Sequence, residues 1–477
     1  MPSSKPRQTY VPQIVVVGGG CSGAAFAVHL ARQARRMVDV AIVEPREIVG
    51  AGVAYSTMDP AHRINVPASR MSLIPQDEGH FDRWLRNSGE LLDDPSALAW
   101  DDELFPRRAA FGRYVNDTLA QAAASGSARI GHVRARATAI VPASDGYLVR
   151  RETGPDLAAD LVVLAASHPP PSTPAALTAA LGSDPRLVRD PWAPNALDVV
   201  GVTDDIVVVG TGLTMADVVA SLDARGHRGR ITAVSRRGQL SRGHAPSSGQ
   251  IRLERGFSLP TSTRALVAEV RACVALREAA GGTWHAVFDM LRRCGPELWR
   301  ALPDVERRRF LRHVRPYWDT HRFRVAPQVE AVLRRRIQDG TLEIVTGSLR
   351  DVAASGDRID VALNRRGRTD AEPLVRRAAA VVVTTGPAHG DAVHRTPPLA
   401  SLLAVGRLRP DPLRLGIHVD PLSRAIGEAG AVDPRLLVVG PLARGAFGEL
   451  MGLPEITVQA ERTALRAAEW IEQRLPV

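Results

Sequence analysis

The feature that most constrains this fold is a run of four β-branched residues followed at once by closely spaced glycines, and it occurs twice. The two copies are Ile14–Val17 with Gly18, Gly20 and Gly23, and Ile206–Val209 with Gly210, Gly212 and Ala216. Such a run predicts a buried parallel strand, and the glycines let the chain turn sharply into a helix. The amides of a helix N-terminus reached in this way can bind a diphosphate. One turn is a weak signal, but two predict two dinucleotide sites.

The residues after the first turn predict an adenosine without a 2'-phosphate. Ala24–Arg36 reads as the following helix, and the strand Val40–Val43 ends on Glu44. A carboxylate at this position accepts hydrogen bonds from the ribose hydroxyls, which argues against a turn that binds nothing. The first site is therefore expected to bind FAD or NAD. Its expected contacts are Gly18, Gly20, Cys21, Ser22, Gly23 and Glu44.

The residues after the second turn predict a different nucleotide. A helix over Thr214–Arg225 leads to the strand Ile231–Val234, which is followed by arginines instead of an acid. A guanidinium can bind a 2'-phosphate through paired hydrogen bonds, whereas an acid would repel it. NADPH is expected, with NADH as the alternative if the arginines only face solvent. The expected contacts are Gly210, Gly212, Leu213, Thr214, Ser235, Arg236, Arg237 and Gly386.

Composition excludes several classes of protein. The formal net charge is +10, but the basic residues are scattered and aromatic residues make up only 4%, so no nucleic-acid partner is expected. Cys21, Cys273 and Cys294 form no CxxC pair, which argues against a disulfide framework or a dithiol relay. His313 and His321 have no clear carboxylate or cysteine partner, so no metal site is expected. Residues 1–13 lack the apolar core of a signal peptide, and no apolar run approaches the length of about 18 residues that a membrane span needs. A cytoplasmic protein without a membrane partner is expected.

The second half of the chain repeats the plan of the first. In each half, short strands that suit an antiparallel meander precede one more buried strand. The expected segments are Arg134–Val141, Tyr147–Arg151 and Leu161–Ala165, and then Leu342–Val345, Leu349–Ala353, Arg358–Leu363 and Ala378–Thr384. A last strand, Leu436–Val439, and a helix over Glu455–Leu475 are expected to complete the first sheet.

This pattern predicts an α/β protein with two Rossmann-like dinucleotide-binding domains, of which the FAD domain is discontinuous and the NAD(P) domain is inserted. The expected parts are 1–167 (FAD domain, first part), 168–203 (proline-rich crossing), 204–386 (NAD(P) domain, with a helical insertion at about 251–336) and 387–477 (FAD domain, C-terminal part).

Several motifs resemble the two-dinucleotide-binding flavoprotein superfamily, and more closely an NAD(P)/FAD-binding protein family related to flavin monooxygenases. They are Gly52–Ser56, Asn65–Ser72, Pro106–Arg108 with Phe111–Tyr114, Gly210–Asp217 and Arg315–Trp318, and the resemblance covers the full length. It implies that Asn65, Arg70 and Met71 lie beside the isoalloxazine ring. It also implies that Gly440, Glu455 and Ile456 approach the ribityl chain and the pyrimidine edge, although Pro441 stands where the superfamily has an acid. The plainer alternative is that Asn65–Pro67 is only a turn and that Met71 fills the core.

The resemblance further implies hydride transfer from NADPH to FAD, so the electron acceptor decides the reaction. With molecular oxygen, the expected reaction is hydroxylation of a small nucleophilic amine through a flavin hydroperoxide. However, Val188–Trp192 replaces the FxGxxxH segment of flavin monooxygenases. The alternatives are an oxidase or reductase without oxygenation, and a redox sensor that binds both nucleotides without catalysis.

The basic helical insertion offers a site for an acidic or amino-acid-like substrate, although the sequence identifies no catalytic residue. Its candidates are Tyr317, Trp318, His321 and Arg322. A packed aromatic and basic helix face is the alternative interpretation of the same residues.

Overall fold

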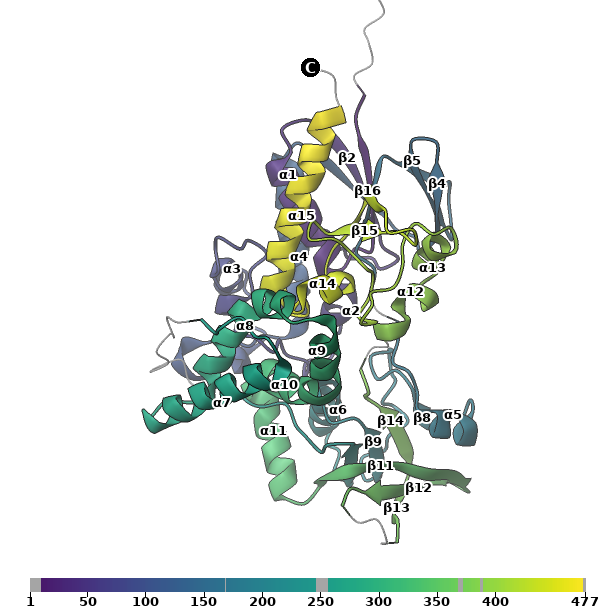
Figure 1. The fold of residues 1–477 in the computed structure, drawn as a ribbon. Helices are drawn as coiled ribbons and strands as arrows, with labels where there is room; N and C mark the ends of the chain where they lie inside the picture. Colours follow the sequence, from purple (N-terminus) through teal and green to yellow (C-terminus); the bar gives the residue numbers. More distant parts are fainter. Residues whose placement is uncertain (1–9, 168, 246–255, 368–371, 387–388, 475–477) are drawn as a thin grey trace, which may run out of the picture.

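The computed structural model describes residues 10–167, 169–245, 256–367, 372–386 and 389–474. Two sheets lie at opposite ends of the molecule, and the helical insertion lies between their levels (Figure 1). Among the described residues, none of the helices combines the length and the apolarity that a membrane crossing requires.

The first sheet has strands from both ends of the chain, in the order β15-β16-β7-β1-β2-β3. All neighbours pair in parallel except β15 with β16. The strands are β1 (Gln13–Val17), β2 (Val38–Val43), β3 (Ala128–Val133), β7 (Leu161–Leu164), β15 (Arg424–Ile426) and β16 (Val432–Val438). Helices α1 (Cys21–Gln33), α4 (Arg108–Ser125) and α15 (Leu453–Arg474) supply residues to the core cluster on one face of this sheet. The last strand predicted from the sequence therefore does join the first sheet.

The second sheet has the order β13-β12-β11-β10-β9-β14-β8. Its segment β14-β9-β10-β11 repeats the order β7-β1-β2-β3 of the first sheet, as expected for a duplicated plan. The strands are β8 (Leu187–Val188), β9 (Ile206–Val209), β10 (Ile231–Ser235), β11 (Leu342–Ser355), β12 (Arg358–Arg365), β13 (Leu374–Ala378) and β14 (Ala380–Val383). Helices α6 (Leu213–Ala224) and α11 (Pro327–Gln338) pack against each other beside it.

The two meanders differ in a way that the sequence did not indicate. In the first half, β4 (Ala137–Ala143), β5 (Gly146–Arg151) and β6 (Leu157–Ala159) form a separate sheet. In the second half, β11 is one long strand with a register shift between Leu349 and Asp351, so the meander continues the main sheet. Two short strands had been expected there.

The proline-rich crossing also contains regular structure. Helix α5 (Ala175–Leu181) lies within it, and β8 pairs in parallel with β14 at the edge of the second sheet. This segment therefore extends the second sheet as well as linking the two halves.

The helical insertion comprises α7 (Thr263–Ala279), α8 (Trp284–Ala301), α9 (Asp304–Arg309), a π-helical segment (Phe310–Val314) and α10 (Arg315–Arg322). The chain stays helical from α9 to α10 although Pro316 lies at the start of α10. The π segment immediately precedes this proline. A π-helical turn is a common way to accommodate an irregular hydrogen-bond pattern inside a helix.

A buried ion pair joins the two halves of the molecule. Arg108, on α4, lies 3.0 Å from each carboxylate oxygen of Asp217, on α6, and both side chains are less than a tenth exposed. Burial raises the pKa of Asp217, and Arg108 opposes that rise. A second bond, of 2.9 Å, links His62 Nε2 and Ser221 Oγ.

Removing one partner of this pair leaves the other buried without compensation. We expect Asp217→Asn to lower the free energy of unfolding by about 3–5 kcal/mol, and Arg108→Met with Asp217→Leu together to recover most of that loss. Denaturant unfolding of the native protein, of Asp217→Asn and of the double variant measures these changes in the free energy of unfolding. The exposed pair of Arg129 and Asp39 provides the control, because Arg129→Gln should leave the midpoint unchanged. An unchanged midpoint in Asp217→Asn would contradict the role given to the pair.

Candidate functional site

The two glycine turns have matching geometry. Gly18 and Gly210 have φ angles of 107° and 122°, which L side chains rarely adopt. A Cβ atom at Gly18 would lie 2.4 Å from the carbonyl oxygen of Ala165, and one at Gly210 would lie 2.5 Å from that of Thr384. Both turns therefore pass directly over the end of the neighbouring strand, β7 or β14, and only glycine fits.

Each turn leads into a helix whose first backbone amides receive no hydrogen bond from a capping side chain. Helix α1 starts at Cys21 after Gly20, and α6 starts at Leu213 after Gly212. The first amides of such helices carry partial positive charge and suit an anionic ligand. The third glycine of the first turn has no counterpart in the second, where Met215 occupies the position and is fully buried.

Glu44 lies beside the first turn, as its spacing predicts. Its carboxylate accepts hydrogen bonds from the backbone N–H of Gly19 at 3.0 Å and from Arg46 Nη1 at 2.9 Å. The carboxylate is thereby held at the end of β2. Burial raises the pKa of Cys21 to about 12, so this cysteine is a thiol and not a reactive thiolate.

Gly440 reaches the first turn from the other end of the chain. A Cβ atom there would lie 2.3 Å from Ser22 Oγ, and the N–H of Gly440 donates to Gln459 Oε1 at 2.9 Å. The structure thus brings Ser22 and Gly440 together, although 417 residues separate them in the sequence.

Ser235, which ends β10, and the two arginines after it have different surroundings. Ser235 Oγ bonds Thr211 Oγ1 at 2.8 Å, which ties it to the second glycine turn. Arg236 is exposed. Arg237 donates to the carbonyl oxygen of His313 at 3.0 Å and lies over the ring of Tyr317.

Pro316 leaves a carbonyl group near Arg237 without its helical donor. Because Pro316 has no N–H, the carbonyl of Arg312 cannot make its usual helical bond to that residue. Arg237 Nη2 lies 3.5 Å from this carbonyl oxygen. Arg237 therefore supports the insertion, and Arg236 is the arginine left available to a ligand.

The segment predicted to lie beside the flavin ring contacts the second half of the chain. His244 Nε2 donates to the carbonyl oxygen of Asn65 at 3.0 Å, and burial lowers the pKa of this histidine to about 3. Arg70 is exposed and lies 3.5 Å from Asp289. Met71 is 3% exposed and belongs to the core, as in the plainer interpretation of this segment.

Two of the predicted site residues belong to one buried ion network. Glu455 binds Arg292 at 2.8 Å and Arg322 at 3.3 Å, and Arg322 also binds Glu449 at 3.1 Å. Burial alone would raise the pKa of Glu455, but Arg292 and Arg322 hold it below its ordinary value. The network fastens the insertion to the start of α15. Ile456, the next residue, is buried.

The four substrate candidates do not converge on one pocket. Tyr317 is half exposed under Arg237, and His321 stacks on Phe288 with ring centroids 4.6 Å apart. Arg322 is held in the ion network, and only Trp318 lines the large cavity described next. The alternative interpretation, a packed aromatic and basic face, describes the surroundings of His321.

A cavity of about 840 Å³ joins three parts of the chain: the second glycine turn, the insertion, and the segment that follows Gly440. Arg236 and Gly386 line it near the turn, and Trp318 lines it from the insertion. Sequence reasoning missed several of its polar or sulfur-containing residues, because no motif or periodicity marks them. They include Asp319, Arg444, Glu449 and Met451.

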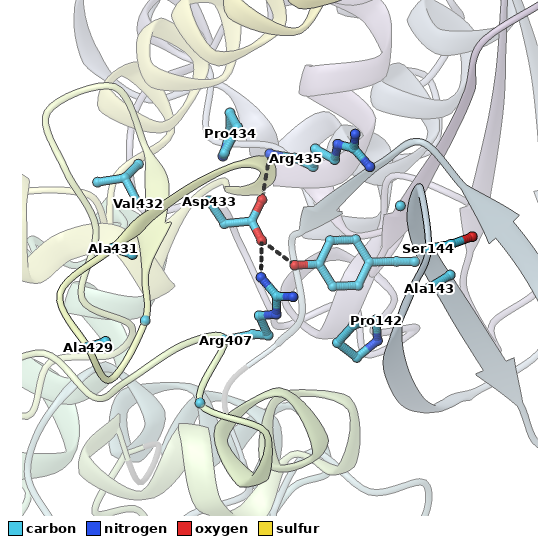
Figure 2. Close-up of a pocket in the computed structure, with 14 residues that line it drawn as sticks. Pro142, Ala143, Ser144, Arg407, Ala429, Ala431, Val432, Asp433, Pro434 and Arg435 are labelled. Carbon is cyan, nitrogen blue, oxygen red and sulfur yellow. Dashed lines mark hydrogen bonds and ion pairs between the residues drawn. The ribbon is translucent and has the colours of Figure 1, made fainter.

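A smaller pocket, of about 380 Å³, lies between the turn of β4 and β5 and the segment that leads into β16 (Figure 2). The Tyr147 hydroxyl donates to Asp433, and Arg407 lies 3.8 Å from the same carboxylate. These charged and polar groups satisfy one another, and no residue of either glycine turn lines the pocket. Across the described ranges, no group of three or more metal-ligating side chains is present.

Comparison with known proteins agrees with this architecture. Residues 15–169 match the FAD-NAD(P)-binding family. No curated protein matches the sequence.

Three solved structures illustrate the similarity. L-lysine 6-monooxygenase from Pseudomonas syringae is 19% identical, with 98% of this chain and 100% of that chain covered and a TM-score of 0.64. The ornithine N-hydroxylase of Kutzneria sp. 744 is 17% identical, with 97% of this chain and 100% of that chain covered and a TM-score of 0.63. The bacillithiol disulfide reductase of Staphylococcus aureus is 11% identical, with 97% of this chain and 99% of that chain covered and a TM-score of 0.55. The chain shares its fold with these enzymes, which confirms the predicted α/β fold class.

Proposed function

We propose that the protein is a FAD-dependent, NADPH-using monooxygenase that hydroxylates the nitrogen of a small, amino-acid-like amine. The observation that carries the proposal is the 840 Å³ cavity, which extends from the second glycine turn to the segment after Gly440. Similarity of fold over the whole chain to lysine and ornithine monooxygenases supports the same reaction class. Molecular oxygen would be the second substrate.

The first sheet and its glycine turn would hold FAD. The turn offers a backbone surface without side chains, and Glu44 offers a buried carboxylate to the ribose hydroxyls. When bound, FAD supplies the redox chemistry, taking a hydride from NADPH and passing electrons to oxygen. The residues proposed to surround the flavin come from two segments: Asn65, Arg70 and Met71, and Gly440, Glu455 and Ile456. Of these, Met71 would act through core packing and Glu455 through its ion pairs.

The second sheet and its turn would hold NADPH. The diphosphate would bind at Gly210, Gly212, Leu213 and Thr214, and the nicotinamide half would lie beside Gly386. Ser235 ends β10 and Arg236 follows it, at the position where an adenosine ribose is expected. We therefore propose that the two sheets, together with their helices, are the two cofactor domains.

The insertion would exclude water from the reaction. Its contribution to the cavity wall is mostly apolar, and includes Leu291, Leu298, Trp299, Leu302 and Trp318. Oxygenation needs such an environment, because water promotes loss of the activated oxygen. A dithiol reductase is disfavoured, since the three cysteines are free and belong to different helices, α1, α7 and α8.

The different surroundings of Arg236 and Arg237 predict that only Arg236 contributes to the preference for NADPH over NADH. We expect Arg236→Gln to reduce the preference for NADPH over NADH by about ten- to a hundred-fold, because a charge-assisted bond to phosphate is lost. Arg237→Gln should leave the preference nearly unchanged. Anaerobic flavin reduction by each nucleotide measures both effects. An equal loss in the two variants would contradict the assignment.

The reaction class is tested by product analysis. The FAD-loaded protein is incubated with NADPH, oxygen and a panel of amino acids and diamines. We expect one amine to accelerate NADPH oxidation and to yield its hydroxylamine in proportion to the NADPH consumed. Oxidation that produces only hydrogen peroxide would indicate an oxidase. Failure of NADPH to reduce the flavin would favour a redox sensor.

A further inference from the structure

Arg444 is a buried arginine that forms no ion pair with a carboxylate among the residues that the structure describes. It follows Gly440 by four residues, starts the short helix α14 (Arg444–Phe447) and is 4% exposed. Among the described residues, its Nε and Nη2 atoms have no hydrogen-bond partner. In the same part of the chain, its Nη1 atom makes one hydrogen bond, to the sulfur of Met451 at 3.3 Å. A sulfur atom is a weak acceptor, so the guanidinium is poorly satisfied.

The other charged groups of the cavity wall are already committed or solvated. Arg315 pairs with Asp319 at 3.3 Å, and Glu449 pairs with Arg322. Arg236 and Arg414 are exposed to solvent. Within the described part of the chain, Arg444 is thus the buried cation of this wall that lacks an anion.

The surroundings of Arg444 make this arrangement costly. Burial, with a contribution from the nearby Arg315, lowers the pKa of Arg444 to about 10, while the carboxylates of Asp319, Glu449 and Asp411 oppose the change. A buried charge is normally retained only with a hydrogen-bonded partner. The missing partner is therefore expected to be an anionic group that enters the cavity.

The position of Arg444 favours a substrate over a nucleotide phosphate. The second glycine turn and Arg236 lie on the part of the cavity that belongs to the second sheet, whereas Arg444 and Met451 belong to the segment after Gly440. Met451 also lines the cavity, and its flexible side chain is the group that an entering anion would displace from Arg444. A guanidinium binds a planar carboxylate through two parallel hydrogen bonds.

We propose that Arg444 is the anchor for a carboxylate of the substrate, with Met451 covering the guanidinium until the substrate enters. This inference rests on the proposed function, because it assigns the chemical class of that enzyme's substrate: an amine that also carries a carboxylate.

The test measures binding without turnover. Thermal unfolding of the FAD-loaded protein is followed with each common amino acid and ornithine, and with the corresponding α- and side-chain amides. We expect at least one acid to raise the midpoint where its amide does not. The apparent Kd of that acid should rise at least tenfold in Arg444→Met. The matched control is Arg414→Met, which removes an exposed arginine from the same wall and should leave the Kd unchanged.

Arg444→Lys guards against a folding defect. It retains the charge, and it should bind the acid more weakly than the native protein but more tightly than Arg444→Met. Three results would each overturn the proposal. The acid and its amide could raise the midpoint of thermal unfolding equally, or an acid could bind Arg444→Met as tightly as it binds the native protein. The third result is that no acid changes the midpoint.

A second measurement separates the substrate from the nucleotide. NADPH is titrated onto the native protein and Arg444→Met without any amino acid, with fluorescence as the signal. We expect the two Kd values to agree within about twofold. A tenfold weaker Kd in Arg444→Met would assign the anion to a phosphate of NADPH and overturn the substrate role. Because neither experiment needs product formation, failure of the monooxygenase reaction would leave this result readable.

Discussion

The buried ion pair between Arg108 and Asp217 is the contact on which the arrangement of the site depends. It lies between a helix of the first sheet and a helix of the second, and the bond between His62 and Ser221 lies beside it. An ion pair removed from water requires good geometry, so it favours one relative position of the two helices over others. That position decides where the second glycine turn lies relative to the first.

A second connection closes the molecule on the side of the insertion. Trp299 Nε1 donates to the carbonyl oxygen of Gly445 at 2.9 Å, and the network of Arg322 with Glu449 and Glu455 lies next to it. A Cβ atom at Gly452 would lie 2.1 Å from Nη2 of Arg322, so the guanidinium lies directly against this glycine. These contacts fasten the insertion to the C-terminal segment, and both parts line the cavity of about 840 Å³.

The sequence was most informative where local sterics decide the structure. The strands, the two glycine turns and Glu44 follow from short-range rules, because a turn of this shape admits only glycine and the acid ends the next strand. Arg237 and Arg322 were harder to interpret, since their partners, His313 and Glu449, are distant in the sequence. A charged residue that serves packing cannot be told from one that binds a ligand until those partners are known. No local sequence pattern marks Arg444, because it stands out only by its burial and by the absence of an anionic partner among the described residues.

Two turns of nearly the same shape are proposed to bind two different cofactors, and the substitutions Gly18→Ala and Gly210→Ala test that assignment most directly. Flavin content and anaerobic reduction by NADPH are measured for both purified proteins. Gly18→Ala should lose FAD, because the new methyl group meets the carbonyl oxygen of Ala165. Gly210→Ala should retain FAD but fail to be reduced by NADPH. Loss of FAD from Gly210→Ala, or full FAD content in Gly18→Ala, would contradict the account.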